Sequence, residues 1–200
     1  MYNIQNDHSI EENYQNGLLP QRNSKHTFYI DENSSSRCNL NLFQLSSENR
    51  RIIKKTENFT YKLIPLSEFL YTPKIQKQLV SWVKELGWEF PVSSIKTVFI
   101  NHIFNYLYEW YDQDKQICAY SICYIDKNIS HIAYVFYNPK LAHNDLPIRL
   151  SLQLVTDSFN SKLKYCYLGR FNAKTKLGYY KRNFPGFQYF TQGQWLSYNQ

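Results

Sequence analysis

The residues best suited to chemistry lie between positions 164 and 184, which read KYCYLGRFNAKTKLGYYKRNF. A short aromatic strand, Tyr165 to Phe171, runs through Gly169 into a turn that is rich in positive charge. Core packing does not require cations to gather there, so we interpret this turn as a rim that meets phosphate groups. Its basic residues are Arg170, Lys174, Lys176, Lys181 and Arg182.

A second basic element lies far upstream, where residues 43–56 read FQLSSENRRIIKKT. We expect a helix here, because Ser46 or Ser47 can accept hydrogen bonds from the N–H groups of its first turn. At about 100° per residue, four cations fall within an arc of roughly 140°, opposite Leu45 and Ile52. The alternative is a merely solvated charged surface. We predict that the cations form one exposed face: Arg50, Arg51, Lys54 and Lys55.

Composition favours a globular protein with an anionic partner. The 200 residues are enough for one well-cored domain plus an appendage. Aromatic residues make up 18% of the chain, and disordered chains lack such aromatic area. The formal net charge of +7 and the isoelectric point of about 9.1 suit nucleic acid or a membrane surface, although such an excess is also common in plain soluble proteins.

The first forty residues are the least committed part of the chain. We expect residues 1–40 to form a polar segment and residues 41–200 to form the main domain. Within the segment, Tyr14, Leu18 and Leu19 are placed to dock as part of a short helix. Residues 25–30 and 39–43 are predicted to pair as a hairpin across the serine-rich loop at residues 31–37.

The cysteines and the apolar runs argue against a metal protein and a membrane protein. The cysteines match no C-x-x-C metal pair and no signal peptide precedes them, so we expect reduced thiols, no metal and a cytoplasmic location. Cys118 and Cys123 are five positions apart, so on a strand they would point to opposite faces. No run approaches the roughly 18 apolar residues of a membrane span, so we expect no membrane partner.

The rest of the chain alternates between strands and helices. We expect a strand at residues 61–66, a helix at residues 72–87 that ends at glycine, and a longer helix at residues 92–110 in which His102 packs in the core. Strands at residues 117–125 and 131–137 should pair through a short turn. A helix capped by Asp145 then leads to a last strand at residues 164–171.

This order of elements resembles the core of the GNAT acyltransferases. In that core, the strand before a helix and the strand after it splay apart, and the donor substrate lies in the cleft. The resemblance implies an α+β fold with a mixed, mostly antiparallel sheet flanked by helices. We therefore predict that the strands at residues 131–137 and 164–171 are neighbours that diverge at one end.

Three motifs within residues 40–190 are similar to segments of the arginyl-tRNA-protein transferases and their bacterial leucyl relatives. Residues 43–56 resemble that family's F-x-P-S-x-S-Q-R-R-V-x-R-R-N. Residues 133–139, AYVFYNP, resemble its strand that ends in aromatic-x-Pro. Tyr167-Leu168-Gly169, followed by Tyr180-Lys181, resembles its YLG and YK pair at matching spacing. The first motif matches at Phe43, Ser46, Arg50, Arg51, Lys54 and Lys55.

The chain departs from that family in two places. Members of the family begin with closely spaced cysteines that bind a metal or a cluster, and here only Cys38 stands near that region. Residues 138–145 also lack the glycine-rich Q/R-x-x-G-x-G/A turn by which acetyltransferases cradle the pyrophosphate of coenzyme A. We therefore expect aminoacyl-tRNA to be the donor substrate and no separate cofactor to be needed.

The resemblance implies transfer of arginine or leucine from aminoacyl-tRNA to the N-terminal α-amine of acceptor proteins. The cationic helix face, together with Lys181 and Arg182, would hold the phosphates of the acceptor stem. Tyr167 and Tyr180 would stack on the terminal adenosine or donate to the oxyanion, unless they simply pack. Gly169 would lie under the substrate or form a bulge. The general base stays open among Asp112, Asp114 and His131.

Two other functions stay open at this point. The first is a GNAT-fold acyltransferase that uses an acyl-coenzyme A, which the order of elements supports and the glycine-free loop opposes. The second is a non-catalytic RNA-binding relative that kept the cationic face without the cysteine region.

Overall fold

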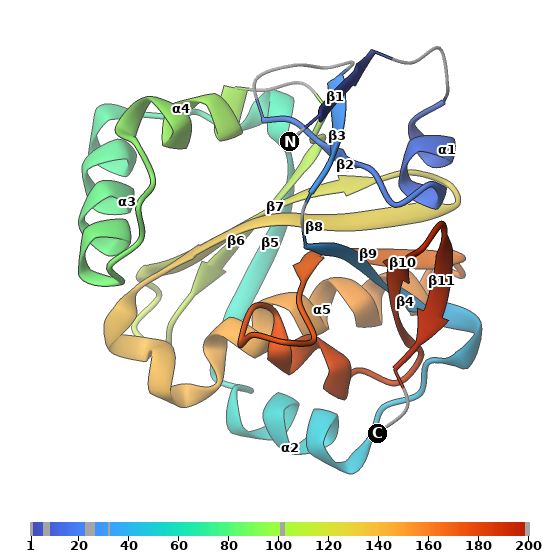
Figure 1. Cartoon of the computed structure of the whole chain (residues 1–200). Helices are drawn as coiled ribbons and strands as arrows, with labels where there is room; N and C mark the ends of the chain where they lie inside the picture. Colours follow the sequence, from blue (N-terminus) through green and yellow to red (C-terminus); the bar gives the residue numbers. More distant parts are fainter. Residues whose placement is uncertain (1, 6–8, 23–26, 32, 101–102, 199–200) are drawn as a thin grey trace.

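The computed structural model describes residues 2–5, 9–22, 27–31, 33–100 and 103–198 and contains an eight-stranded sheet with helices on both faces (Figure 1). The strand order is β11-β10-β4-β9-β8-β7-β6-β5, and within the described residues only β8 and β9 pair in parallel. The expected α+β fold with a mostly antiparallel sheet is confirmed. The strands are β4 (Ser34–Asn39), β5 (Thr60–Pro65), β6 (Tyr106–Tyr111), β7 (Ile117–Ile125), β8 (Ile129–Tyr137), β9 (Tyr165–Phe171), β10 (Phe187–Thr191) and β11 (Gln194–Ser197).

Helices and a small second sheet cover the two faces of the large sheet (Figure 1). One face carries α2 (Ser47–Lys55) and α5 (Leu146–Asn160). The other face carries α1 (Ile10–Gln15), α3 (Pro73–Glu85), α4 (Val92–Ile100) and the three-stranded sheet β1-β3-β2. The strands of that sheet are β1 (Tyr2–Gln5), β2 (Leu19–Pro20) and β3 (Thr27–Ile30), and single helical turns occur at Leu40–Leu42, Leu66–Glu68, Pro139–Asn144 and, as η4, at Tyr179–Asn183.

Alternating side chains on the central strands build one core on each face of the sheet. On β7, Ala119 and Cys123 belong to the core under α5, whereas Tyr120 and Ile122 belong to the core under α3 and α4. This alternation follows from the period of two along a strand. The strands that carry the candidate site are therefore covered on both faces.

β8 and β9 separate soon after they begin. They pair only from Ile129↔Tyr165 to His131↔Tyr167, although both strands continue beyond that point. The predicted divergence of these two strands is therefore confirmed. We call the opening between them the β8–β9 fork.

A bulge in β9 accompanies the fork. Ser36 of β4 pairs with Gly169, but Arg37 pairs with Tyr167, so β9 has one extra residue at this point. Gly169 has a φ of +73°, a backbone conformation that costs glycine little and other residues more. Because bulges bend a strand and increase its twist, this one explains why β9 turns away from β8. The predicted bulge at Gly169 is confirmed.

The hairpin predicted within the first forty-three residues is wrong. β3 pairs with β1 and β2 in the small sheet, whereas β4 lies between β9 and β10 in the large one. The serine-rich stretch that we expected to be a loop is part of β4. Ser36 is fully buried there, and its Oγ donates to the carbonyl oxygen of Gly169 at 2.7 Å.

The long helix predicted at residues 92–110 is also wrong. α4 ends at Ile100, and residues 106–111 form β6, whose sequence YLYEWY is rich in the aromatic residues that strands favour. Leu107 and Trp110 are both fully buried there. His102 lies outside the described residues. The helices predicted at residues 72–87 and 145–160 are confirmed as α3 and α5.

The two cysteines of β7 lie on the same face, contrary to the sequence prediction. The pairing of β6 with β7 skips Cys118, and this bulge turns Cys118 toward the core that also contains Cys123. Among the described residues there is no group of three His, Cys, Asp or Glu side chains that could hold a metal. The described part of the chain also has no helix that is long and apolar enough to cross a membrane.

Candidate functional site

A cavity of about 260 Å³ opens where β8 and β9 part. β8 contributes His131, Ala133 and Tyr134, and β9 contributes Gly169 and Arg170. The N-terminal part of the chain contributes Leu19, Pro20, Arg22 and Tyr29 to the wall. The segment after α3 contributes Glu89 and Phe90, and the segment after α4 contributes Phe104. The cavity therefore has an aromatic lining, two arginines and one glutamate.

His131 presents an unused nitrogen at this cavity. The residue is 4% exposed, and its Nδ1 lies 2.7 Å from the hydroxyl oxygen of Tyr14 on α1. Burial raises the pKa of Tyr14 well above its usual value, so the phenol keeps its proton, and we assign Tyr14 as the donor to Nδ1. Nε2 then carries the ring proton; it is buried, and among the described residues it has no hydrogen-bond partner. Burial, with a smaller contribution from Lys181, lowers the pKa of His131 to about 3, so the ring is neutral.

Lys181 approaches the same space from η4. Its Nζ donates to the carbonyl oxygen of Arg170 at 2.8 Å. Burial, and then the charge of Arg170, lowers the pKa of Lys181 to about 7. A methyl group placed on Gly169 would lie 3.8 Å from Nε2 of His131 and 4.0 Å from Nζ of Lys181. The absent side chain of Gly169 therefore leaves a space that a donor nitrogen and a weakly basic amine both border.

Gly178 allows η4 to come this close to β9. It has a φ of +67°, and a methyl group there would lie 2.7 Å from the carbonyl oxygen of Arg170. It would also lie 3.3 Å from Nζ of Lys181. A glycine is thus required both by the backbone conformation and by the contact that positions Lys181.

The predicted cationic face on α2 is exposed, as expected, and Ile52 is packed on the opposite side. The helix begins as predicted, because Ser46 and Asn49 exchange the hydrogen bonds of a capping box. Leu45, expected on the packed side, is half-buried and packs against the core under α5. The four cations of the face do not all lack acidic partners, however.

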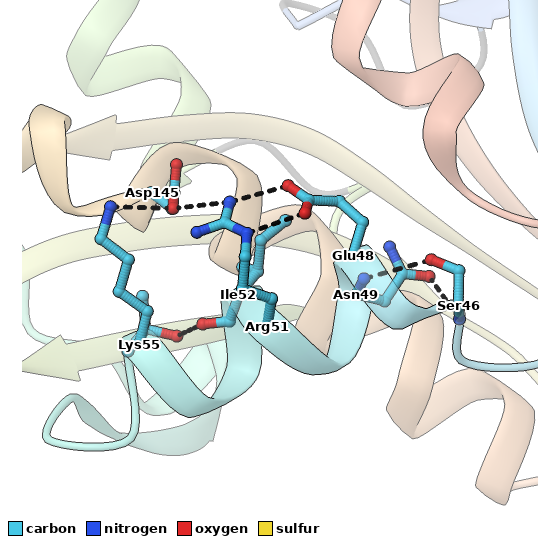
Figure 2. Close-up of polar contacts among 8 residues, drawn as sticks. Ser46, Glu48, Asn49, Arg51, Ile52, Lys55 and Asp145 are labelled. Carbon is cyan, nitrogen blue, oxygen red and sulfur yellow. Dashed lines mark hydrogen bonds and ion pairs between the residues drawn. The ribbon is translucent and has the colours of Figure 1, made fainter.

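Two carboxylates bind part of the α2 face, as Figure 2 shows. Arg51 makes two hydrogen bonds of 2.7 Å to Glu48 and one of 3.1 Å to Asp145, and Lys55 lies 3.1 Å from Asp145. Asp145 occupies the N-cap position of α5, as predicted, but its side chain makes no capping hydrogen bond there. It joins α2 to the start of α5 instead.

The remaining predicted residues lie away from the cavity wall. Tyr167 is fully buried and packs against Tyr14, with ring centroids 4.6 Å apart, so it packs rather than faces solvent. Tyr180 shares a hydrogen bond of 3.1 Å with Ser151 of α5. Arg182 lies over the ring of Tyr179, with its guanidinium carbon 3.4 Å from the ring centroid.

The structure separates the three candidates for the general base. Asp112 holds the β6–β7 turn, where its Oδ1 accepts hydrogen bonds from the backbone N–H groups of Asp114 and Gln116. Only His131 lies at the fork. Tyr14 is a site residue that the sequence did not identify, because its partner His131 is 117 positions away.

The comparisons with known proteins support the fold. The C-terminal domain of a putative lysylphosphatidylglycerol synthetase from Agrobacterium fabrum matches with a TM-score of 0.52 at 12% identity, over 74% of this chain and 49% of that chain. A GCN5-related glucosamine N-acetyltransferase region of a fungal multi-domain β-N-acetylglucosaminidase matches with a TM-score of 0.50 at 11% identity, over 94% of this chain and 23% of that chain. This chain thus spans about half or less of each of these proteins. No protein-family model and no curated protein matches the sequence. The chain has a GNAT-like acyltransferase fold.

Proposed function

We propose that this protein transfers an aminoacyl group from aminoacyl-tRNA to the N-terminal α-amine of acceptor proteins. The observation that carries the proposal is the pair of nitrogens, Nε2 of His131 and Nζ of Lys181, around the open face of Gly169 at the β8–β9 fork. The fold adds support, because it is shared with a domain whose name describes the joining of a lysyl group to phosphatidylglycerol. The transferred amino acid would be arginine or leucine.

The reaction would need no activated nucleophile, because the acceptor amine itself attacks the ester carbonyl. A C–N bond forms, and the C–O bond to the terminal ribose breaks. Neutral Lys181 would take the proton from the attacking amine and return it to the leaving ribose oxygen, which suits a pKa of about 7. The N–H of His131 would donate to the carbonyl oxygen as it becomes negative, and such a donor contributes about 3 to 4 kcal/mol.

The residues that line the cavity suit the terminal nucleotide of the tRNA, which carries the amino acid as an ester. Phe90 and Tyr134 offer aromatic surface for a base, and Arg22 offers positive charge, while Arg170 is paired with Asp31 at 3.7 Å. The exposed cations of α2 and Arg182 would contact phosphates of the acceptor stem. Tyr180 would act by holding η4 against Ser151, so that Lys181 stays at the fork.

The test is a transfer assay with radiolabelled arginyl- or leucyl-tRNA and peptides with defined N-termini. Lys181→Met keeps the length of the side chain and should lower transfer about a hundredfold or more, as expected for a lost general base. Lys181→Arg keeps the charge but cannot lose its proton, so it should not restore transfer. Lys127→Met, at an exposed lysine of the turn between β7 and β8, is the matched control and should leave transfer unchanged.

His131→Asn tests the second nitrogen in the same assay. Asparagine keeps a partner for Tyr14 but has no group in place of Nε2, so transfer should fall by about a hundredfold or more. Transfer that survives both substitutions, or wild-type protein that transfers from neither tRNA, would refute the proposal.

The acyl-coenzyme A alternative draws support only from the fold. Residues 138–145 form a single helical turn at Pro139–Asn144 that ends at Asp145, without a glycine-rich anion loop. Asp145 stands at the start of α5, where its carboxylate is bound by Arg51 and Lys55. A non-catalytic RNA-binding protein would bind tRNA but give no transfer product, so the same assay separates it from the enzyme.

A further inference from the structure

A second cavity, of about 370 Å³, lies under the C-terminal end of α5, and the argument for it does not depend on the proposed function. It is bounded by β5, β6 and the last turn of α5, on the opposite face of the sheet from the first cavity. We call it the α5 cavity. Its wall consists of Tyr61, Leu63, Tyr108, Ile125, Leu154, Asp157, Ser158, Asn160, Ser161 and Leu163.

The α5 cavity contains a carboxylate that only neutral groups bind. Oδ2 of Asp157 accepts hydrogen bonds from Tyr108 at 2.9 Å and from Tyr61 at 3.4 Å. Its Oδ1 accepts one from Nε2 of Gln153 at 2.6 Å. Among the described residues, no Lys, Arg or His lies within ion-pair distance of this carboxylate. A carboxylate has about four acceptor positions, so one is left for a ligand.

Arg149 is the cation of α5 that could be expected to pair with Asp157. It donates to Oε1 of Gln153 and lies over the ring of Trp110, 5.5 Å from the ring centroid. Its guanidinium is thus occupied by Gln153 and Trp110, and Gln153 stands between it and Asp157. Asp157 itself belongs to the cavity wall, and Arg149 does not.

The end of α5 adds to the negative potential of the cavity. Asn160 and Ser161, which end the helix, belong to the wall, and the last turn of α5 contains no basic residue. Helix C-termini carry a partial negative charge that favours cations within the last turn. The carboxylate of Asp157 and the end of α5 thus form a local region of negative potential in a chain whose net charge is +7.

Aromatic rings complete the surroundings of the carboxylate. The ring of Tyr61 lies 5.3 Å from that of Tyr108 and 4.9 Å from that of Trp110, between centroids. Tyr61 is 36% exposed and Leu63 is 45% exposed, so solvent reaches the mouth of the cavity. Aromatic faces attract organic cations, and more strongly where the contact is shielded from water.

We propose that the α5 cavity binds the alkylammonium group of a small organic cation. Asp157 supplies the opposite charge, Tyr61 and Tyr108 supply aromatic surface, and the leucines and Ile125 contact the alkyl part. A neutral molecule of the same shape would lose the charge-dependent contacts.

Calorimetric titration of the whole chain tests this site with choline and with propylammonium at constant ionic strength. At least one of the two should bind. The affinity of the uncharged carbon isostere of choline should be lower than that of choline by a factor of about ten or more, as the loss of a cation–π contact predicts. Asp157→Asn keeps the shape of the side chain and should weaken binding by a similar factor or more. Glu57→Gln, at an exposed carboxylate, removes the same charge elsewhere and should have no effect.

Tyr61→Leu is a second variant, in case the change at Asp157 disturbs the fold. It removes the aromatic ring at the exposed mouth and should also weaken binding. The proposal is overturned if neither cation binds, if the uncharged isostere binds as well as choline, or if folded Asp157→Asn protein binds the same cation as the wild type with unchanged affinity.

Discussion

At the scale of single residues, Lys181 connects the site to the stability of the protein. Its pKa is about 7 in the folded protein, against about 10.4 for an unperturbed lysine. Between these values the unfolded chain binds more protons than the folded one, so the contribution of Lys181 makes the protein more stable as pH rises. Below a pH of about 7 both states are protonated, and the contribution stays at its least favourable level.

Lys181→Met should remove this dependence. We expect the free energy of unfolding of the wild type, minus that of the variant, to increase as pH rises from about 7 to about 10. Urea unfolding of both proteins at several pH values measures the difference. His131 titrates at a much lower pH, so it does not contribute in this window. A difference that stays constant across the window would contradict the lowered pKa.

The sequence identified individual site residues only where a residue type suited to the chemistry also belonged to the motif with the family resemblance. Gly169 and Lys181 stood in the motif with the family resemblance, and both border the space at the fork. Tyr167 stood in the same motif but is fully buried, because strand period alone decides which face a side chain joins. Tyr14 could not be assigned, since its contact with His131 depends on tertiary structure.

At the scale of elements, η4 depends on a glycine that serves two purposes. Gly178→Ala would strain a positive φ and would also place a methyl group 2.7 Å from the carbonyl oxygen of Arg170. Gly193→Ala is the matched control, because Gly193 has a φ of +78° but nothing within 4 Å of the added methyl group. Both variants should lose about 1 kcal/mol of stability from backbone strain.

Only Gly178→Ala should displace Lys181 and lower the rate of transfer. Unfolding measurements and the transfer assay on both variants separate strain from displacement. If the two variants transfer at the same rate, η4 does not position Lys181.

Elements were predictable where one periodicity extended over the whole segment. The amphipathic pattern of α3 and the apolar run of β7 gave the correct element type. β6 was missed because its aromatic residues also fit the face of a helix continuing from α4. β4 was missed because serines usually signal a loop, and its burial depends on partners more than a hundred residues away.

At the scale of the whole molecule, the two cationic elements both contact α5. α2 does so through Asp145, and η4 does so through Tyr180 and Ser151. Arg51 and Lys55 are partly neutralised by carboxylates, whereas no ion pair among the described residues includes Arg50 or Lys54. Arg50 and Lys54 are therefore the better candidates for contact with phosphate.

The double variant Arg50→Ala, Lys54→Ala should weaken tRNA binding in a salt-dependent way. Each lost phosphate contact should reduce the slope of log K against log salt by about 0.7 to 0.9. Filter binding over a range of salt concentrations measures the slope. Lys127→Ala with Lys164→Ala, exposed just before the paired ends of β8 and β9, is the control of equal charge and should leave the slope unchanged. Equal slopes for both double variants would mean that the α2 face is only a solvated surface.

The position of β4 between β9 and β10 governs how the chain can fold as it is synthesised. Ser36 pairs with Gly169 on one side and Tyr189 on the other, so both partners leave the ribosome long after β4. At about 5 to 20 residues per second, β4 waits roughly 7 to 30 s for them. During that interval its unpaired backbone groups resemble those of an exposed edge strand, which other chains can pair with. The three serines at Ser34–Asn39 keep that waiting strand polar, and we therefore expect them to lower its tendency to aggregate before the sheet closes.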